Sequence, residues 1–271
     1  MTIKTVYITG AASGLGQEIA RRYASQGTNL ALFDIHFDEE SCKKIEAIRS
    51  NTQQRIGYYE ADVCDCSALM EKIALSETEV GCPNMVLHCA GVQKAGTFDT
   101  VSQEEFERVV RINLFGSRNV AQGSIPLLKK VQGPAKLVFV SSMAGFVGTF
   151  AYSSYSSSKF GVLGLAQTLR MELAAENVKV QVICPPEVDT PMVHKEHKCI
   201  HPATLKLKLM TGTLSLNEAI NSIMSGLKRD SFYIIPGFKA RVTYWLTRLL
   251  PVWLSNAITD FIVRKALKQH A

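Results

Sequence analysis

Tyr155 and Lys159 are the first two residues whose types and spacing suggest chemistry. They are four residues apart in a segment with helical apolar spacing, so their side chains share one helix face. A phenol is a poor acid–base catalyst at neutral pH, because its ordinary pKa is about 10. A nearby ammonium stabilises the phenolate and lowers that pKa. The pair predicts a tyrosine that exchanges a proton with a substrate. Such pairs also arise by chance, so the prediction depends on other motifs.

Two polar residues upstream fit the same chemistry. Ser142 follows a β-branched run at 136–141, where its hydroxyl is placed to hold a substrate carbonyl while Tyr155 donates a proton. Asn113 lies inside a long predicted helix at 104–129, although Asn is a mediocre helix former. Its amide is suited to bind a water linked to Lys159. A structural Ser and a solvated Asn are the alternatives for each residue taken alone.

A glycine-rich turn joins the first predicted strand to the helix that follows. Glycines let the backbone turn tightly and approach a pyrophosphate, whose charge then lies at the helix N-terminus. The position between a strand and a helix is the context that supports this interpretation over a simple tight turn. The turn reads Thr9-Gly10-Ala11-Ala12-Ser13-Gly14-Leu15-Gly16.

Asp34 ends the second predicted strand, near the distance expected for a carboxylate that binds the adenosine ribose hydroxyls. A carboxylate accepts two hydroxyl donors and repels a 2′-phosphate, so Asp34 favours NAD(H). The alternative is that Asp34 caps the next helix, although Asp38 suits that purpose better. NADP(H) stays open as the second choice, since three basic side chains are near this end of the chain: Arg21, Arg22 and His36.

Further cofactor positions follow the third and fourth predicted strands. Ligands of open α/β sheets dock at the carboxyl ends of the strands. Asp62 is placed to accept a hydrogen bond from an adenine amino group, and Val63 is next to it. The small residues Ala90 and Gly91 allow a ribose to pack against the backbone.

The elements that must position these residues alternate along the chain. Short, buried strands alternate with helical segments, which predicts βαβ units and a parallel sheet covered on both faces. Residues 193–213 have weak strand signals and are interpreted as an insertion. The predicted strands are residues 3–9, 29–33, 55–61, 85–89, 136–141, 179–184 and 231–236, and the clearest helices are 15–26, 67–77, 104–129 and 155–176.

In combination, the TGxxxGxG turn, Asn113, Ser142 and the YxxxK motif resemble the short-chain dehydrogenase/reductase family over about residues 3–236. The resemblance implies a Rossmann fold with a seven-stranded, mostly parallel, doubly wound sheet, and hydride transfer between a nicotinamide and a ketone or secondary alcohol. It implies that Tyr155 is the acid–base, that Lys159 lowers its pKa and binds the nicotinamide ribose, that Ser142 polarises the substrate oxygen and that Asn113 supports a proton relay. The implied cofactor positions are Gly10, Ser13, Gly14, Leu15, Gly16, Asp34, Asp62, Val63, Ala90, Gly91, Tyr155, Lys159, Val188 and Thr190.

Two segments depart from the common pattern of this family. His88-Cys89-Ala90-Gly91 stands where Asn-Asn-Ala-Gly is usual, and Pro185-Pro186-Glu187 stands where Pro-Gly is usual. Three segments resemble the 3-ketodihydrosphingosine reductase-like branch, which implies a hydrophobic, lipid-like ketone: Cys89–Gly91, Pro185–Pro191 and Phe139–Phe160. That branch generally uses NADPH, which conflicts with Asp34. The alternative function is a non-catalytic nucleotide-binding sensor or scaffold on the same fold. The family often forms homodimers or homotetramers, which is our expectation here.

The last part of the chain differs from the rest in charge. The 271 residues carry a formal charge of +6, and from residue 228 onward eight Lys and Arg side chains stand against two Asp, so this segment holds the whole excess. We predict a catalytic domain at 1–237 and an amphipathic helical tail at 238–271. Apolar pairs every four residues, both tryptophans and flanking cations are typical of an interfacial membrane helix. A helix pair that covers the substrate cleft or binds another subunit is the alternative, with Pro251 as a kink or the start of a second helix.

Composition excludes several other classes of protein. In the basic tail the charges are interleaved with large apolar residues and do not cluster on one polar face, which argues against nucleic-acid binding. The sequence has no run of about 18 uncharged apolar residues, so we expect no transmembrane helix. The first residues lack the basic stretch and apolar core of a secretory signal. The seven cysteines contain no CxxC pair, so we expect neither a metal site nor a disulfide framework. These features favour a cytoplasmic enzyme, with peripheral membrane association through the tail as an addition.

Overall fold

A seven-stranded parallel sheet forms the centre of the molecule in the computed structural model, which describes residues 3–197 and 200–269. The sheet order is β3-β2-β1-β4-β5-β6-β9, and every pair of neighbours is parallel. This confirms the predicted Rossmann sheet, with no antiparallel edge. The strands are β1 Thr5–Thr9, β2 Asn29–Asp34, β3 Ile56–Glu60, β4 Met85–His88, β5 Ala135–Val140, β6 Val178–Ile183 and β9 Tyr233–Ile234.

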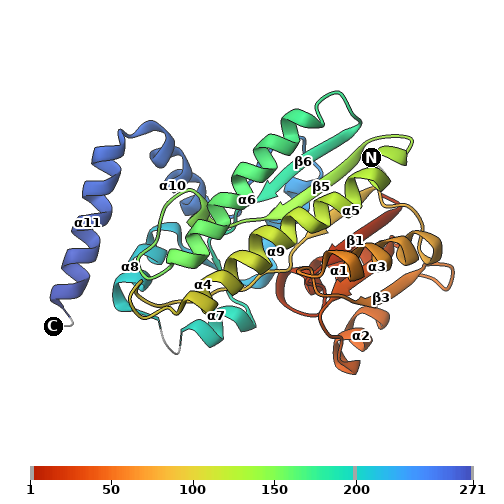
Figure 1. Cartoon of the computed structure of the whole chain (residues 1–271), viewed down its shortest axis with the longest axis horizontal. Helices are drawn as coiled ribbons and strands as arrows, with labels where there is room; N and C mark the ends of the chain where they lie inside the picture. The colour runs from red at the N-terminus through yellow and green to blue at the C-terminus, as the bar shows by residue number, and fades with distance from the viewer. Residues whose placement is uncertain (1–2, 198–199, 270–271) are drawn as a thin grey trace.

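Helices cover both faces of the sheet (Figure 1). Successive strand side chains point to opposite faces, so Tyr7 of β1 packs into one apolar layer while Val6 and Ile8 pack into the other. The Tyr7 side contacts α3 (Cys66–Glu79), α5 (Gly116–Lys130) and α6 (Ser153–Glu172). The opposite side contacts α1 (Gly14–Ala24), α2 (Glu39–Glu46) and α9 (Leu216–Leu227). Because helices pack against both faces, the sheet is held in place, and so are the ends of its strands.

The long helix predicted at 104–129 contains an irregular turn. It begins as α4 (Gln103–Val110), passes through a π-helical segment at Arg111–Phe115, and continues as α5. A capping box at Ser102 and Glu105 starts the first part. A π-helical turn inserts one residue into the helix and is frequent at functional sites. Asn113 lies inside this turn.

The segment after β6 folds into a small unit of its own. β7 (Glu187–Val188) and β8 (Thr213–Leu214) pair in parallel, and between them lie α7 (Pro191–Glu196) and α8 (Pro202–Thr211). Residues 193–213, predicted as an insertion, therefore form mostly helix. The pairing of β7 with β8 brings α8 back to the end of the main sheet.

Two helices follow β9. They are α10 (Phe238–Leu249) and α11 (Val252–Lys268), with Pro251 between them at the position that caps α11. The prediction that Pro251 starts a second helix is confirmed. Both helices pack against α8, and α11 lies at one end of the long axis of the molecule (Figure 1). Within residues 3–197 and 200–269, no helix has the length and apolar character needed to cross a membrane.

Candidate active site

A cavity of about 810 Å³ lies at the carboxyl ends of the strands. The strand order reverses between β1 and β4. Open α/β sheets bind their ligands at the carboxyl ends of the strands beside such a reversal. All the predicted cofactor positions line this one cavity: Gly10, Ser13, Gly14, Leu15, Gly16, Asp34, Asp62, Val63, Ala90, Gly91, Tyr155, Lys159, Val188 and Thr190.

The glycine-rich turn has the geometry that a bound pyrophosphate requires. Gly10 and Gly14 have φ values of +68° and +57°, which residues other than Gly rarely adopt. A Cβ at Gly10 would lie 2.6 Å from the backbone nitrogen of Ala90. A Cβ at Gly14 would meet only Thr190, at 4.0 Å, on the cavity side. The turn thus exposes backbone and the N-terminus of α1 to the cavity, which fits a dinucleotide phosphate.

Asp34 connects this turn to the end of β2. Its Oδ2 accepts a hydrogen bond from Ala12 N at 2.8 Å, and its Oδ1 accepts one from Ile35 N at 2.8 Å. Each carboxylate oxygen keeps a lone pair for a ribose hydroxyl. The alternative role as a helix cap belongs to Asp38, whose side chain accepts from Ser41 N. Asp34 therefore remains free to serve the cofactor.

NADP(H) was kept as the second choice because of Arg21, Arg22 and His36, and all three side chains contact residues outside the cavity. Arg21 and Arg22 both pair with Glu18, and Arg22 also donates to Asn217 Oδ1. His36 pairs with Glu60 at 2.9 Å. None of the three lines the cavity beside Asp34 in the described part of the chain.

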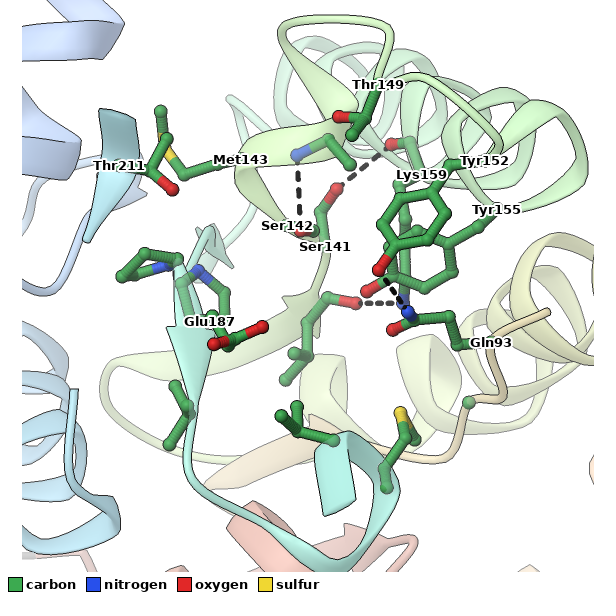
Figure 2. A pocket seen from close by; sticks show the side chains of 18 of the residues that line it. Gln93, Ser141, Ser142, Met143, Thr149, Tyr152, Tyr155, Lys159, Glu187 and Thr211 are labelled. Carbon is green, nitrogen blue, oxygen red and sulfur yellow. Dashed lines mark hydrogen bonds between the residues drawn. The ribbon is translucent and has the colours of Figure 1, made fainter. Parts of the chain in front are cut away.

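Tyr155, Lys159 and Ser142 come together in the cavity (Figure 2). Tyr155 lies in the first turn of α6, and the Lys159 Nζ is 5.5 Å from the centroid of its ring. Lys159 Nζ donates to Val140 O at 3.0 Å, so the end of β5 holds it in place. Ser142 starts a 3-10 turn at Met143–Gly145, and its hydroxyl accepts from Ala144 N at 3.1 Å.

Burial changes the acidity of both groups of the motif. Burial raises the pKa of Tyr155 above its ordinary value, while the Ser142 side chain and the charge of Lys208 act in the opposite direction. Burial lowers the pKa of Lys159 to about 8. The sequence assigned the acidifying charge to Lys159 alone. In the structure the cation that lowers the pKa of Tyr155 is Lys208 of α8, and the effect of Lys159 stays a prediction.

Asn113 is nearly fully buried and does not line the cavity. Its Nδ2 donates to Val92 O and to Ser158 Oγ, both at 2.9 Å, and its Oδ1 accepts from Val92 N at 2.8 Å. The amide thus fixes the loop after β4. A Cβ added to Gly91 would lie 3.1 Å from Asn113 Oδ1 and 3.5 Å from Lys159 Nζ, so both atoms border one small space. A water in the predicted relay would fit this arrangement, and the relay stays a prediction.

Several polar residues of the cavity were not predicted from the sequence as site candidates, among them Gln93, Tyr152, Glu187 and Lys208. Gln93 Nε2 donates to the Tyr152 hydroxyl at 2.6 Å, and the Tyr152 ring meets the Tyr155 ring edge-on at 5.7 Å. Glu187 lies across the pocket from these residues in Figure 2, and it is paired with Lys208 at 2.7 Å. Only Glu187 had a signal in the sequence, since it follows the unusual Pro185-Pro186 pair.

The tail supplies the outer wall of the same cavity. An aromatic cluster holds α10 on the body, with Phe146 and Tyr244 ring centroids 4.8 Å apart and Tyr233 and Tyr244 5.6 Å apart. The tail side chains that line the cavity are Thr243, Leu246, Thr247, Leu250, Val252, Ser255, Asn256, Ile258 and Thr259. The predicted alternative, in which the tail covers the cleft, therefore agrees with the observed packing.

Comparison with known proteins agrees with this geometry. The short chain dehydrogenase family profile matches residues 4–200, and the chain belongs to the short-chain dehydrogenase/reductase family. Within that family, a 3-ketodihydrosphingosine reductase of Bos taurus is 35% identical over 98% of this chain and 87% of its own length. The resemblance to that branch, first suggested by the segments at residues 89–91, 139–160 and 185–191, is confirmed.

Solved structures share the fold at lower identity. A short chain dehydrogenase/reductase from Burkholderia phymatum in complex with NAD aligns with a TM-score of 0.76 and 22% identity, covering 91% of this chain and 92% of that one. A short chain dehydrogenase from Burkholderia cenocepacia in complex with NADP aligns with a TM-score of 0.75 and 18% identity, covering 96% and 97%. The protein is an oxidoreductase, and of these two structures with its fold one is in complex with NAD and the other with NADP.

Proposed function

We propose that the protein transfers hydride between NAD(H) and a hydrophobic, lipid-like ketone or secondary alcohol. The observation that carries this proposal is one cavity lined both by Tyr155 and Ser142 and by apolar side chains of the tail, namely Leu246, Leu250, Val252 and Ile258. The name of the Bos taurus relative, a 3-ketodihydrosphingosine reductase, supports a long-chain ketone as substrate.

The residues of the chain divide the work of a reduction among them. A bound nicotinamide supplies the hydride. Ser142 donates a hydrogen bond to the substrate oxygen, and Tyr155 donates the proton that converts this oxygen into a hydroxyl. Lys159 binds the nicotinamide ribose and stabilises the phenolate that remains. In the direction of oxidation, Tyr155 accepts the proton from the alcohol.

Substitution of Tyr155 tests the reaction. We expect NADH-dependent reduction of long-chain ketones by the unmodified protein, and a loss of about 10³-fold in kcat for Tyr155→Phe, because the proton donor is removed. Tyr58→Phe is the matched control, since the Tyr58 hydroxyl contacts Cys42 O and Glu46 instead of the cavity. Full turnover by Tyr155→Phe contradicts the mechanism, and tight cofactor binding without turnover on any ketone favours the sensor or scaffold.

We infer a preference for NADH from Asp34 and from the pairing of Arg21 and Arg22 with Glu18. Binding titrations with NADH and NADPH test it. We expect NADH to bind at least tenfold more tightly, and Asp34→Ser to reduce that ratio, because the carboxylate that repels a 2′-phosphate is gone. Tighter binding of NADPH by the unmodified protein contradicts this preference.

The outward face of α10 and α11 is proposed to contact a lipid surface. Trp245, Trp253 and Phe261 are 59%, 70% and 67% exposed, and cations flank them. Large aromatic residues with interspersed Lys and Arg are typical of a helix at an anionic membrane surface. On this basis the cavity wall and the lipid-binding face are the two sides of one helix pair, and a lipid ketone reaches the active site from the bilayer.

Flotation with vesicles that contain anionic lipid tests this contact. We expect the unmodified protein to float and the double variant Trp245→Glu and Trp253→Glu to remain at the bottom. Met171→Glu is the matched control, because Met171 is 60% exposed on α6 and lies outside the tail. Equal flotation of all three proteins excludes the tail as the membrane contact.

A further inference from the structure

Three charged side chains are buried together beside the active site. Lys208 Nζ is 2.7 Å from a carboxylate oxygen of Glu187 and 2.7 Å from one of Glu196. The side chains of Lys208, Glu187 and Glu196 are only 12%, 3% and 4% exposed. Taking charges out of water is costly even when they are paired, and apolar residues in their place often stabilise a protein as well or better. A gain in stability alone therefore does not account for a cluster of this kind.

The cluster is rigidly constructed from three elements. Glu187 is in β7, Glu196 in α7 and Lys208 in α8. Glu187 also accepts from Thr213 Oγ1 at 2.9 Å and pairs with His197 Nε2 at 3.0 Å. Three contacts with carboxylate oxygens, two of Glu196 and one of Glu187, hold the ammonium of Lys208. Glu187 and Lys208 both line the cavity that contains Tyr155.

A short chain of contacts leads from Lys208 to Tyr155. The ammonium is 5.4 Å from the centroid of the Tyr152 ring, a cation–π distance. The Tyr152 ring meets the Tyr155 ring edge-on, and the hydrogen bond from Gln93 holds Tyr152 in that orientation. Lys208 is thus a buried cation one aromatic ring away from the proton donor.

We propose that Lys208 is a positioning residue for the proton transfer at Tyr155. Its ammonium, fixed by Glu187 and Glu196, stabilises the Tyr155 phenolate from the α8 side, while Lys159 does so from within α6. This inference rests on the proposed function. It assigns to α8, which carries none of the predicted motif residues, a direct influence on the acid–base step.

The charges around Tyr155 set the sign of the expected effect. Lys159 of α6 and Lys208 of α8 favour the phenolate, whereas Glu187 of β7 and Glu196 of α7 oppose it and are largely offset by their contact with Lys208. Consistent with this, the charge of Lys208 lowers the pKa of Tyr155 against the effect of burial. Removal of the Lys208 charge therefore raises that pKa, and the two carboxylates left behind raise it further.

Titration of Tyr155 by NMR tests the proposal without a substrate. The protein is labelled with ¹³Cζ-tyrosine, NAD⁺ is added, and the Tyr155 signal is assigned from its loss in Tyr155→Phe. A unit charge on the order of 10 Å away shifts a buried pKa by about one unit. We expect Lys208→Met to raise the pKa of Tyr155 by about one unit and Lys208→Arg to leave it close to the original value.

Lys206→Met is the matched control. It removes the same charge from the same helix, but Lys206 Nζ contacts Gln269 in the direction of α11. We expect no change in the pKa of Tyr155. Should Lys208→Met unfold because two carboxylates lose their partner, the double variant Lys208→Met and Glu196→Gln keeps the test possible, since Glu187 retains His197 and Thr213.

An unchanged pKa of Tyr155 in the folded Lys208→Met protein overturns the proposal, even where ketone turnover is observed. A pKa raised equally by Lys206→Met also overturns it, because the effect would then be one of general surface charge. A raised pKa together with a pH profile for alcohol oxidation displaced by the same amount supports it. A raised pKa with no turnover on any ketone supports the coupling of Lys208 to Tyr155 and contradicts the proposed reaction.

Discussion

At the scale of single residues, the hydroxyls of Tyr155 and Ser142 have unequal tasks. In the proposed reaction, Tyr155 transfers a proton, whereas Ser142 stabilises the charge that develops on the substrate oxygen. The backbone fixes Ser142 before a substrate arrives, because Ala144 N donates to its hydroxyl at the start of the 3-10 turn. A donor held in place in this way has little reorganisation cost during the reaction.

We predict that Ser142→Ala lowers kcat by about 10²-fold, because one donor to the developing oxyanion is lost. The affinity for NADH should stay the same, since Ser142 is not among the residues assigned to the cofactor. Steady-state kinetics and cofactor titration measure the two effects. Ser157→Ala, an exposed position on α6, serves as the control and should leave both unchanged. A large loss of NADH affinity in Ser142→Ala would contradict the assigned role.

A second residue-scale prediction concerns His88, where the family commonly has Asn. His88 is almost fully buried, and its Nδ1 contacts Thr9 Oγ1 at 2.7 Å, while its Nε2 has no hydrogen-bond partner among the described residues. Burial lowers its pKa from 6.5 to about 3. Between these two pH values the unfolded chain binds a proton that the folded protein does not, so stability falls as the pH falls, by about 1.4 kcal/mol per pH unit.

We expect His88→Asn to remove this acid sensitivity. The variant should unfold at a lower pH than the unmodified protein, with a flatter dependence of the free energy of unfolding on pH between 6 and 4. Urea denaturation at a series of pH values measures it. Parallel curves for the two proteins would show that His88 does not contribute to acid unfolding.

At the scale of elements, the π-helical turn at Arg111–Phe115 connects the helix layer to the cavity. It presents the side chain of Asn113 to Val92 and Ser158 while α4 and α5 continue on either side. Asn113 therefore connects three parts of the structure: the helix α4–α5 that contains it, the loop that follows β4, and helix α6. The position of Gly91 beside Lys159 depends on this connection.

We predict that Asn113→Ala lowers the free energy of unfolding by about 3 kcal/mol, because three hydrogen bonds are lost and the partly buried Val92 N loses its partner. Urea denaturation measures the change. Asn217→Ala, which removes only an exposed contact with Arg22, should change stability by about 0.5 kcal/mol or less. Equal stability of the two variants would contradict a structural role for Asn113.

At the scale of the whole molecule, the chain closes its active site with its own last helices. The Rossmann sheet provides the proposed cofactor end, α7 and α8 provide the charged side, and α10 and α11 provide an outer wall of mixed apolar and polar side chains. The net charge of +6 belongs to this wall and its surroundings, whereas the cofactor end depends on backbone and helix dipole.

A chain-length experiment tests the wall. Ser255 of α11 lines the cavity, and we expect Ser255→Trp to lower kcat/KM for long-chain ketones by about tenfold or more while short-chain ketones react normally, because only the distal space is filled. Ala257→Trp, an exposed position on the same helix outside the cavity, is the control and should not discriminate by length. Equal losses on short and long ketones would show that α11 does not bind the chain.

Much of this protein is determined by its sequence alone, because the relevant signals are local. The alternation of strands and helices, the turn at Gly10–Gly16 and the spacing of Tyr155 and Lys159 are visible within a few residues, and they predict the parallel sheet and the cofactor edge. The tertiary structure decided the rest. Lys208 meets Tyr152 across 56 positions of sequence, and the tail folds back to line the cavity of a motif almost a hundred residues before it. Such contacts depend on how β7 pairs with β8 and on where α10 packs, and no periodicity in the sequence records either.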